Sequence, residues 1–175
     1  MEVPERFLRQ ENPSPPSKEA VEENRSRLAR MEEMEKRGVR ESDIPQLMRF
    51  LDPIVPFPPP EIKRLPEGYA QAKAADLLEG LGEAAHPQLL TAVKEGHCRV
   101  AAFDILAGQG CKQVFDEAFS LPDAGELGSR MVLYLPWRGP IDPPAMRAWY
   151  QANRHRLVFD KATRRFNLLT VQKPM

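Results

Sequence analysis

Residues 72–82 read AKAADLLEGLG, and residues 100–110 read VAAFDILAGQG. These two stretches decide the fold, because identical residues recur along them at the same positions. The coinciding pairs are Ala74 and Ala102, Asp76 and Asp104, Leu78 and Leu106, Gly80 and Gly108, and Gly82 and Gly110. A recurrence of this kind indicates that one structural unit is used more than once.

The residue types in the matched stretches favour a helix that packs closely against other helices. Small alanines let a neighbouring helix approach, and leucines fill the layer between the two. Glycines end each helix, because they adopt the left-handed conformation at little cost. A second short helix follows each stretch, starting near Gln88 in the first copy and near Gln113 in the second. Since one helix pair cannot bury its apolar face, we expect the copies to stack into an α-solenoid.

The pattern resembles HEAT-like repeats, particularly the short bacterial type that also occurs in phycobilisome lyase subunits. The resemblance covers residues 42–135 and implies an all-α fold, a short right-handed solenoid of antiparallel helix pairs. The C-terminal segment is similar to the aromatic capping segment of bacterial HEAT-repeat proteins, which implies that its aromatic side chains cover the open end of the stack. The residues that carry this second similarity are Trp149, Tyr150, Asn153, Leu157, Phe159, Asp160, Arg165 and Phe166.

Composition and proline content divide the chain into four predicted parts. An extended arm covers 1–16, and a charged N-terminal helix covers 17–41. The HEAT-like repeats occupy 42–144 and are interrupted by a proline-rich loop at 52–67, where dense prolines exclude helix and central strand. A last helix and a small hairpin cap occupy 145–175.

Capping residues predict where the helices begin and end. Ser17 and Gly38 bound the first helix, and Ser42 or Asp43 is expected to cap the next one. The first helix has a narrow apolar stripe, which favours docking along the body over a self-pairing coiled coil. The stripe residues are Val21, Leu28, Met31 and Met34. Further helices are expected at 44–51, 70–81, 87–95, 99–107, 112–119 and 124–134, the last of these capped by Asp123. A final helix is expected from Pro143 or Pro144 to 156. The two strands of a hairpin are expected in 157–169.

The overall composition excludes several classes of protein. Hydrophobic residues make up 42% of the 175 residues, enough for one core, and the formal net charge of zero argues against a globally basic nucleic-acid binder. Two cysteines exclude a disulfide-dense secreted scaffold. The sequence has no apolar run near the roughly 20 residues of a membrane helix and no signal-peptide stretch at its start. We therefore expect a cytoplasmic protein without membrane association.

The charges are distributed unevenly along the chain. Residues 145–175 contain seven basic residues and one acidic residue, whereas residues 42–144 contain fourteen acidic and nine basic residues. Two interpretations stay open: the basic end docks on the acidic middle, or it forms a surface for nucleic acid or another polyanion. The residues of the polyanion hypothesis are Arg147, Arg154, Arg156, Arg164 and Arg165.

The predicted binding surface for another protein is the groove lined by the second helix of each repeat. Trp137 and Arg138 are added from a proline-flanked loop, because Trp and Arg are enriched at interface hot spots; a packed core position is the alternative for Trp137. For Asp76 and Asp104 we favour structural hydrogen bonds over acid–base chemistry. The solvent-facing candidates in the groove are Gln71, Lys73, Asp76, Glu79, Arg99, Asp104 and Arg130.

No catalytic or cofactor motif is recognisable. The sequence has no nucleophile elbow, no phosphate-binding loop and no dinucleotide fingerprint. His97, Cys98 and Cys111 fall short of the four ligands of a structural zinc site. We therefore expect no cofactor and no enzymatic activity. The main hypothesis is an adaptor or scaffold that binds a protein, and the alternative is a polyanion binder. The lyase-type resemblance implies a third role, a chromophore-lyase-like helper.

Overall fold

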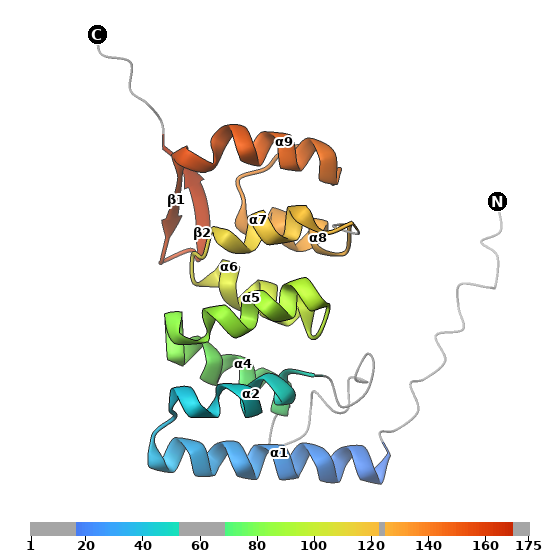
Figure 1. Cartoon of the computed structure of the whole chain (residues 1–175), viewed down its shortest axis with the longest axis vertical. Helices are drawn as coiled ribbons and strands as arrows, with labels where there is room; N and C mark the ends of the chain where they lie inside the picture. Colours follow the sequence, from blue (N-terminus) through green and yellow to red (C-terminus); the bar gives the residue numbers. More distant parts are fainter. Residues whose placement is uncertain (1–16, 53–68, 123–124, 170–175) are drawn as a thin grey trace, which may run out of the picture.

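A computed structural model describes residues 17–52, 69–122 and 125–169. These residues are mostly helical, with one two-stranded antiparallel sheet near the C-terminus (Figure 1). The predicted arm at 1–16, the proline-rich loop beyond Asp52 and the Asp123 cap lie outside the described residues.

The helices lie in layers along the long axis of the molecule (Figure 1). In chain order they are α1 (Lys18–Arg37), α2 (Ile44–Leu51), α4 (Ala70–Leu81), α5 (His86–Glu95), α6 (Arg99–Gly108), α7 (Gln113–Ser120), α8 (Gly125–Tyr134) and α9 (Pro143–Asn153). Short 3₁₀ turns cover Glu41–Asp43, Gly82–Ala85 and Arg154–Arg156, and the strands are β1 (Leu157–Asp160) and β2 (Arg165–Leu168). The last helix thus ends three residues before its predicted end, because the chain tightens into a 3₁₀ turn.

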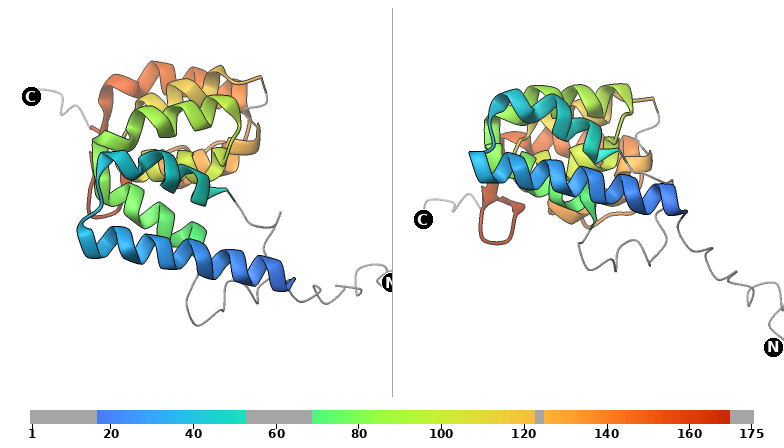
Figure 2. Two further views of the ribbon diagram at one scale, coloured as in Figure 1. Left: turned by 60° about the horizontal axis from the view of Figure 1, so that its bottom comes forward. Right: turned by 90° about the horizontal axis from the view of Figure 1, so that it is seen from below.

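The layers form two columns. Helices α2, α5 and α7 lie in one column, and α4, α6 and α8 lie in the other (Figures 1 and 2). α2 packs on α4 and α5 packs on α6, while α4 contacts α6 and α6 contacts α8 along their column. α1 packs on α4 at one end, and α9 lies at the other end. The two matched stretches of sequence, which form α4 and α6, are therefore neighbours in one column.

Helix ends follow the predicted caps at α1 but not at α2. The Ser17 hydroxyl accepts a hydrogen bond from the Ala20 N–H at 3.1 Å, and Gly38 with φ of 83° ends α1. Before α2, Asp43 occupies the N-cap position, one of the two predicted, but the expectation that its side chain caps the helix is wrong. The Asp43 carboxylate instead accepts the Arg40 N–H at 2.9 Å and Arg37 Nη2 at 2.5 Å, because a 3₁₀ turn turns it back toward α1.

Helix α1 docks on the body along one edge. Leu28, Met31 and Met34 of the predicted stripe are buried, whereas Val21 is only half-buried. Asn24 is also fully buried, and its Oδ1 accepts the Ala70 N–H at 2.9 Å. An α1 side chain thus caps α4, and the stripe that a coiled coil would use is covered by the rest of the chain.

The C-terminal hairpin has one apolar face, as its alternating sequence predicts. Leu157 pairs with Leu168, and Phe159 pairs with Phe166, so these four side chains share the inner face. The Phe166 ring packs edge-on against Phe115 at 5.5 Å between centroids. The hairpin lies beside the helix ends, and it is α9 that lies across the end of the stack (Figure 1). The predicted aromatic cap is therefore divided between the hairpin and α9.

Candidate partner-binding face

A hollow of about 720 Å³ lies along the column of α4, α6 and α8. Its lining combines small and large apolar side chains with polar groups, and the most buried of these residues are Leu51 and Ile105. Ala72 of α4 and Val100 of α6 occupy equivalent positions in the matched stretches, so the repeat itself places small residues on both sides. The small side chains of the lining are Ala72, Ala75, Val100 and Ala101, the larger apolar ones are Leu51, Tyr69 and Ile105, and the polar ones are Gln71, Glu79, Asp104, Tyr134 and Arg164.

Asp104 holds α6 to α8. Arg130 donates through Nε to Asp104 Oδ1 at 3.0 Å and through Nη2 to Oδ2, and the Tyr134 hydroxyl donates to Oδ1 at 3.2 Å. Burial, reinforced by the Asp104 carboxylate, raises the pKa of Tyr134 to about 12. The Asp104 carboxylate thus makes structural hydrogen bonds, in agreement with our interpretation, and both of its partners lie on α8. Asp76, the equivalent residue of α4, is exposed.

Arg164 closes one end of the hollow from the tip of the hairpin. Its Nε donates to the Gly108 carbonyl at 3.2 Å, and its Nη2 pairs with Glu79 Oε1 at 2.8 Å. The backbone φ of Arg164 is 54°, in the left-handed region that non-glycine residues rarely adopt. One side chain from the C-terminal segment thereby joins the ends of α4 and α6.

These contacts favour docking of the basic end on the acidic middle. Arg154 pairs with Asp116 at 2.8 Å, in addition to the pair between Arg164 and Glu79. Arg156 and Arg165 donate to the backbone carbonyls of Leu169 and Val132. Arg147, the remaining residue of the polyanion hypothesis, is exposed on α9.

Several predicted face residues connect neighbouring elements. Gln71 Nε2 donates to the Leu51 carbonyl at 2.7 Å, and Lys73 pairs with Glu35 of α1 at 2.6 Å. Arg99 lies outside the hollow, where its Nε donates to the Val93 carbonyl at 3.0 Å and its Nη1 lies 3.3 Å from Glu126 Oε2. These side chains are held in place by the fold.

Trp137 and Arg138 lie apart from the hollow, between α8 and α9. Trp137 is half-buried, its ring centroid is 5.7 Å from that of Trp149, and its Nε1 donates to the Pro140 carbonyl at 2.9 Å. Arg138 is exposed. The packing agrees with the alternative interpretation of Trp137 as a core residue.

The two cysteines are half-buried free thiols. Burial raises the pKa of Cys98 to about 12, with a smaller contribution from Asp52, and burial also raises the pKa of Cys111. Both thiols are therefore protonated near neutral pH and are poor nucleophiles. Within residues 17–52, 69–122 and 125–169, His, Cys, Asp and Glu form no group of three or more suited to a metal ion. No helix in this part of the chain has the length and apolar character needed to cross a membrane.

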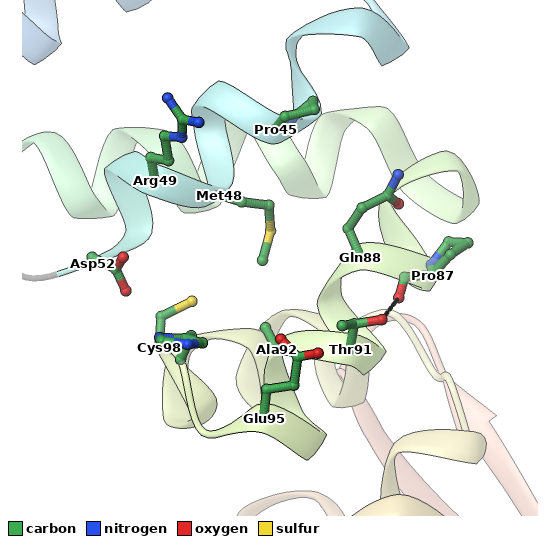
Figure 3. Close-up of a pocket in the computed structure, with 11 residues that line it drawn as sticks. Pro45, Met48, Arg49, Asp52, Pro87, Gln88, Thr91, Ala92, Glu95 and Cys98 are labelled. Carbon is green, nitrogen blue, oxygen red and sulfur yellow. Dashed lines mark hydrogen bonds between the residues drawn. The ribbon is translucent and has the colours of Figure 1, made fainter.

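A second hollow, of about 520 Å³, lies between α2 and α5 in the other column, and none of its lining residues belongs to the predicted binding surfaces (Figure 3). A signal for it was present: Pro45, Met48, Arg49 and Asp52 recur at the spacing of one helix face. The α2 face forms a hollow only when the matching face of α5 lies beside it. Since the tertiary structure sets this pairing, the sequence of α2 alone does not predict the hollow.

Comparisons of the chain with protein-family models, curated proteins and solved structures find no match.

Proposed function

We propose that the chain is a short right-handed α-solenoid of HEAT-like repeats and acts as a non-enzymatic adaptor that binds another protein. The binding face is the column of α4, α6 and α8. The observation that carries the proposal is the hollow of about 720 Å³ between two helices of matching sequence, with small side chains from both helices in its lining.

Small side chains in the lining of the hollow favour a protein ligand. Ala72, Ala75 and Ala101 leave room for the backbone of a partner helix to approach closely, which large side chains would prevent. The polar part of the lining supplies hydrogen-bonding groups, because the Gln71 side-chain oxygen can accept while its Nε2 is held by Leu51. Ion pairs already fix Glu79 and Asp104, so little side-chain entropy remains to be lost on binding.

The test begins with a photo-crosslinking residue at Ala72, which is exposed and lines the hollow, and with the same residue at Ala29, exposed on α1, as control. In a lysate of the source organism, we expect one protein to crosslink from position 72 and not from position 29. With that protein purified, Ala72→Arg is expected to raise the Kd at least about tenfold, because it fills the hollow, and Ala29→Arg to leave it unchanged. Equal affinities for both variants would refute the proposal.

A polyanion binder is the second candidate. It is favoured by Arg154 and Arg164, whose side chains remain 52% exposed despite their ion pairs. If the chain binds a single-stranded DNA oligonucleotide, its affinity should fall steeply with salt. Joint replacement of Arg154, Arg156, Arg164 and Arg165 by alanine should then abolish binding. Weak binding that is insensitive to salt would exclude this function.

A further inference from the structure

The hollow between α2 and α5 is built from two parallel helix faces. Asp52 follows the last residue of α2 and Glu95 is the last residue of α5, and both line the same hollow, so the two helices end on the same side. The α2 face consists of Pro45, Met48, Arg49 and Asp52, and the α5 face consists of Gln88, Thr91, Ala92 and Glu95. Two such ridges leave a groove in which an extended or helical segment can lie.

The middle of this hollow is apolar and adaptable. The Met48 side chain points from α2 toward α5 and Cys98, and Ala92 lies across from it (Figure 3). Pro45 and Pro87 add rigid apolar surface. A half-buried methionine suits a binding surface, because its thioether is flexible and polarisable.

One end of the hollow carries two carboxylates, and the exposed His97 also lines the hollow. Asp52 and Glu95 stand at the carboxyl ends of α2 and α5, where the helix dipoles add partial negative charge. Within the described part of the chain, neither carboxylate makes an ion pair. Figure 3 shows the Arg49 guanidinium pointing away from Met48 and Asp52, so the nearest cation on α2 does not occupy this end.

We propose that this hollow binds a partner segment that presents an apolar side chain followed by a lysine or arginine. The apolar side chain packs on Met48 and Ala92, and the cation lies between Asp52 and Glu95. This site is on a different column from the proposed adaptor face, and the inference does not depend on that function. Two separate faces of unlike chemistry would allow the chain to hold two partners together.

The test uses methyl NMR of the full chain, with the Met48 and Ala92 methyl groups as reporters. One titration uses N-acetyl-leucyl-leucyl-arginine amide, and a matched titration uses the glutamate peptide of the same length. We expect the arginine peptide to shift both methyl signals with a Kd about threefold to fivefold below that of the glutamate peptide, the range of a partly exposed ion pair.

Variants separate charge from packing. The double variant Asp52→Asn with Glu95→Gln is expected to remove the preference for arginine. Its melting temperature should stay unchanged or rise slightly, because neither carboxylate has an ion-pair partner to lose and both oppose the helix dipoles. Asp76→Asn on α4 is the control and should keep the preference. The proposal is overturned if the two peptides bind equally, if neither shifts the reporter methyls up to its solubility limit, or if the shifts fall on α4 and α6.

Discussion

The two matched stretches, 72–82 and 100–110, have the same residues at five positions but different surroundings. A Cβ at Gly82 would meet no atom within 4 Å among the described residues, whereas one at Gly110 would lie 2.6 Å from the Phe159 ring. Asp76 is exposed, whereas Asp104 binds Arg130 and Tyr134. The second copy lies deeper in the stack, where α8 and the hairpin contact it. Repetition in sequence therefore sets the helices, and position in the stack sets what each residue does.

The largest expected contrast is between Gly110→Ala and Gly82→Ala. Both glycines have a positive φ, 82° and 60°, and Gly82 has a ψ of −134°, so alanine is strained at either position by about 1 to 3 kcal/mol. At Gly110 the new methyl group also displaces Phe159, so we expect its loss in unfolding free energy to exceed that of Gly82→Ala by about 1 to 3 kcal/mol. Urea denaturation of the two variants measures the difference. Equal losses would mean that the hairpin does not pack on α6.

A smaller contrast is expected between the equivalent aspartates. Asp104→Ala removes the carboxylate to which Arg130 and Tyr134 donate, and should lower the unfolding free energy by about 1 to 2 kcal/mol. Asp76→Ala should change it by less than about 0.5 kcal/mol, because Asp76 is exposed. Thermal unfolding followed by circular dichroism compares the stabilities of the two variants. A loss of stability in Asp76→Ala as large as that in Asp104→Ala would contradict the difference in environment, exposed for Asp76 and hydrogen-bonded for Asp104.

Gly108 and Gly80 provide a third comparison. Gly80→Ala is expected to stabilise the chain by about 0.5 to 1 kcal/mol, since the position is open and alanine favours the helix. Gly108→Ala should lack this gain, because its Cβ would lie 2.5 Å from Arg164 Nη2 and would push the guanidinium away from Glu79. Denaturant midpoints report the sign of each change. Stabilisation by both variants would show that Arg164 does not lie over α6.

The last effect, a change of stability with pH, concerns the proton on Tyr134 and is absent at neutral pH. Its pKa of about 12 exceeds the ordinary value, so the folded chain holds this proton more tightly than the unfolded chain. The resulting stability is fully present below pH 10 and is lost as the pH rises toward 12. Ultraviolet titration of the intact chain and of Tyr134→Phe should give this pKa from the difference between the two curves. In Asp104→Asn, the pKa of Tyr134 should be lower. An ordinary tyrosine pKa would contradict the buried contact with Asp104.

Local sequence signals were sufficient for most helix ends and for the hairpin. Ser17 and Gly38 bound α1 as predicted, because capping depends on residues within one turn. The contact between α4 and α6 likewise agrees with the expectation that the matched stretches are neighbours.

Contacts between distant parts of the chain were beyond sequence reasoning. Asn24 caps α4 across 46 residues, and Arg164 reaches Glu79 across 85 residues. The residues next to Asn24 and Arg164 in the sequence do not indicate these contacts, since a polar residue in a helix or a turn is ordinarily solvated. The groove residues were also predicted as solvent-facing, whereas Lys73, Glu79 and Asp104 are engaged in ion pairs.

The most direct test of the account is whether α4 and α6 lie side by side with their small residues facing one hollow. Methyl–methyl nuclear Overhauser effects in a sample labelled at alanine and valine methyl groups measure this. We predict cross-peaks that connect Ala72 or Ala75 of α4 with Val100 or Ala101 of α6. Their absence, together with cross-peaks from Ala75 to α9, would contradict the layered arrangement and the binding face that depends on it.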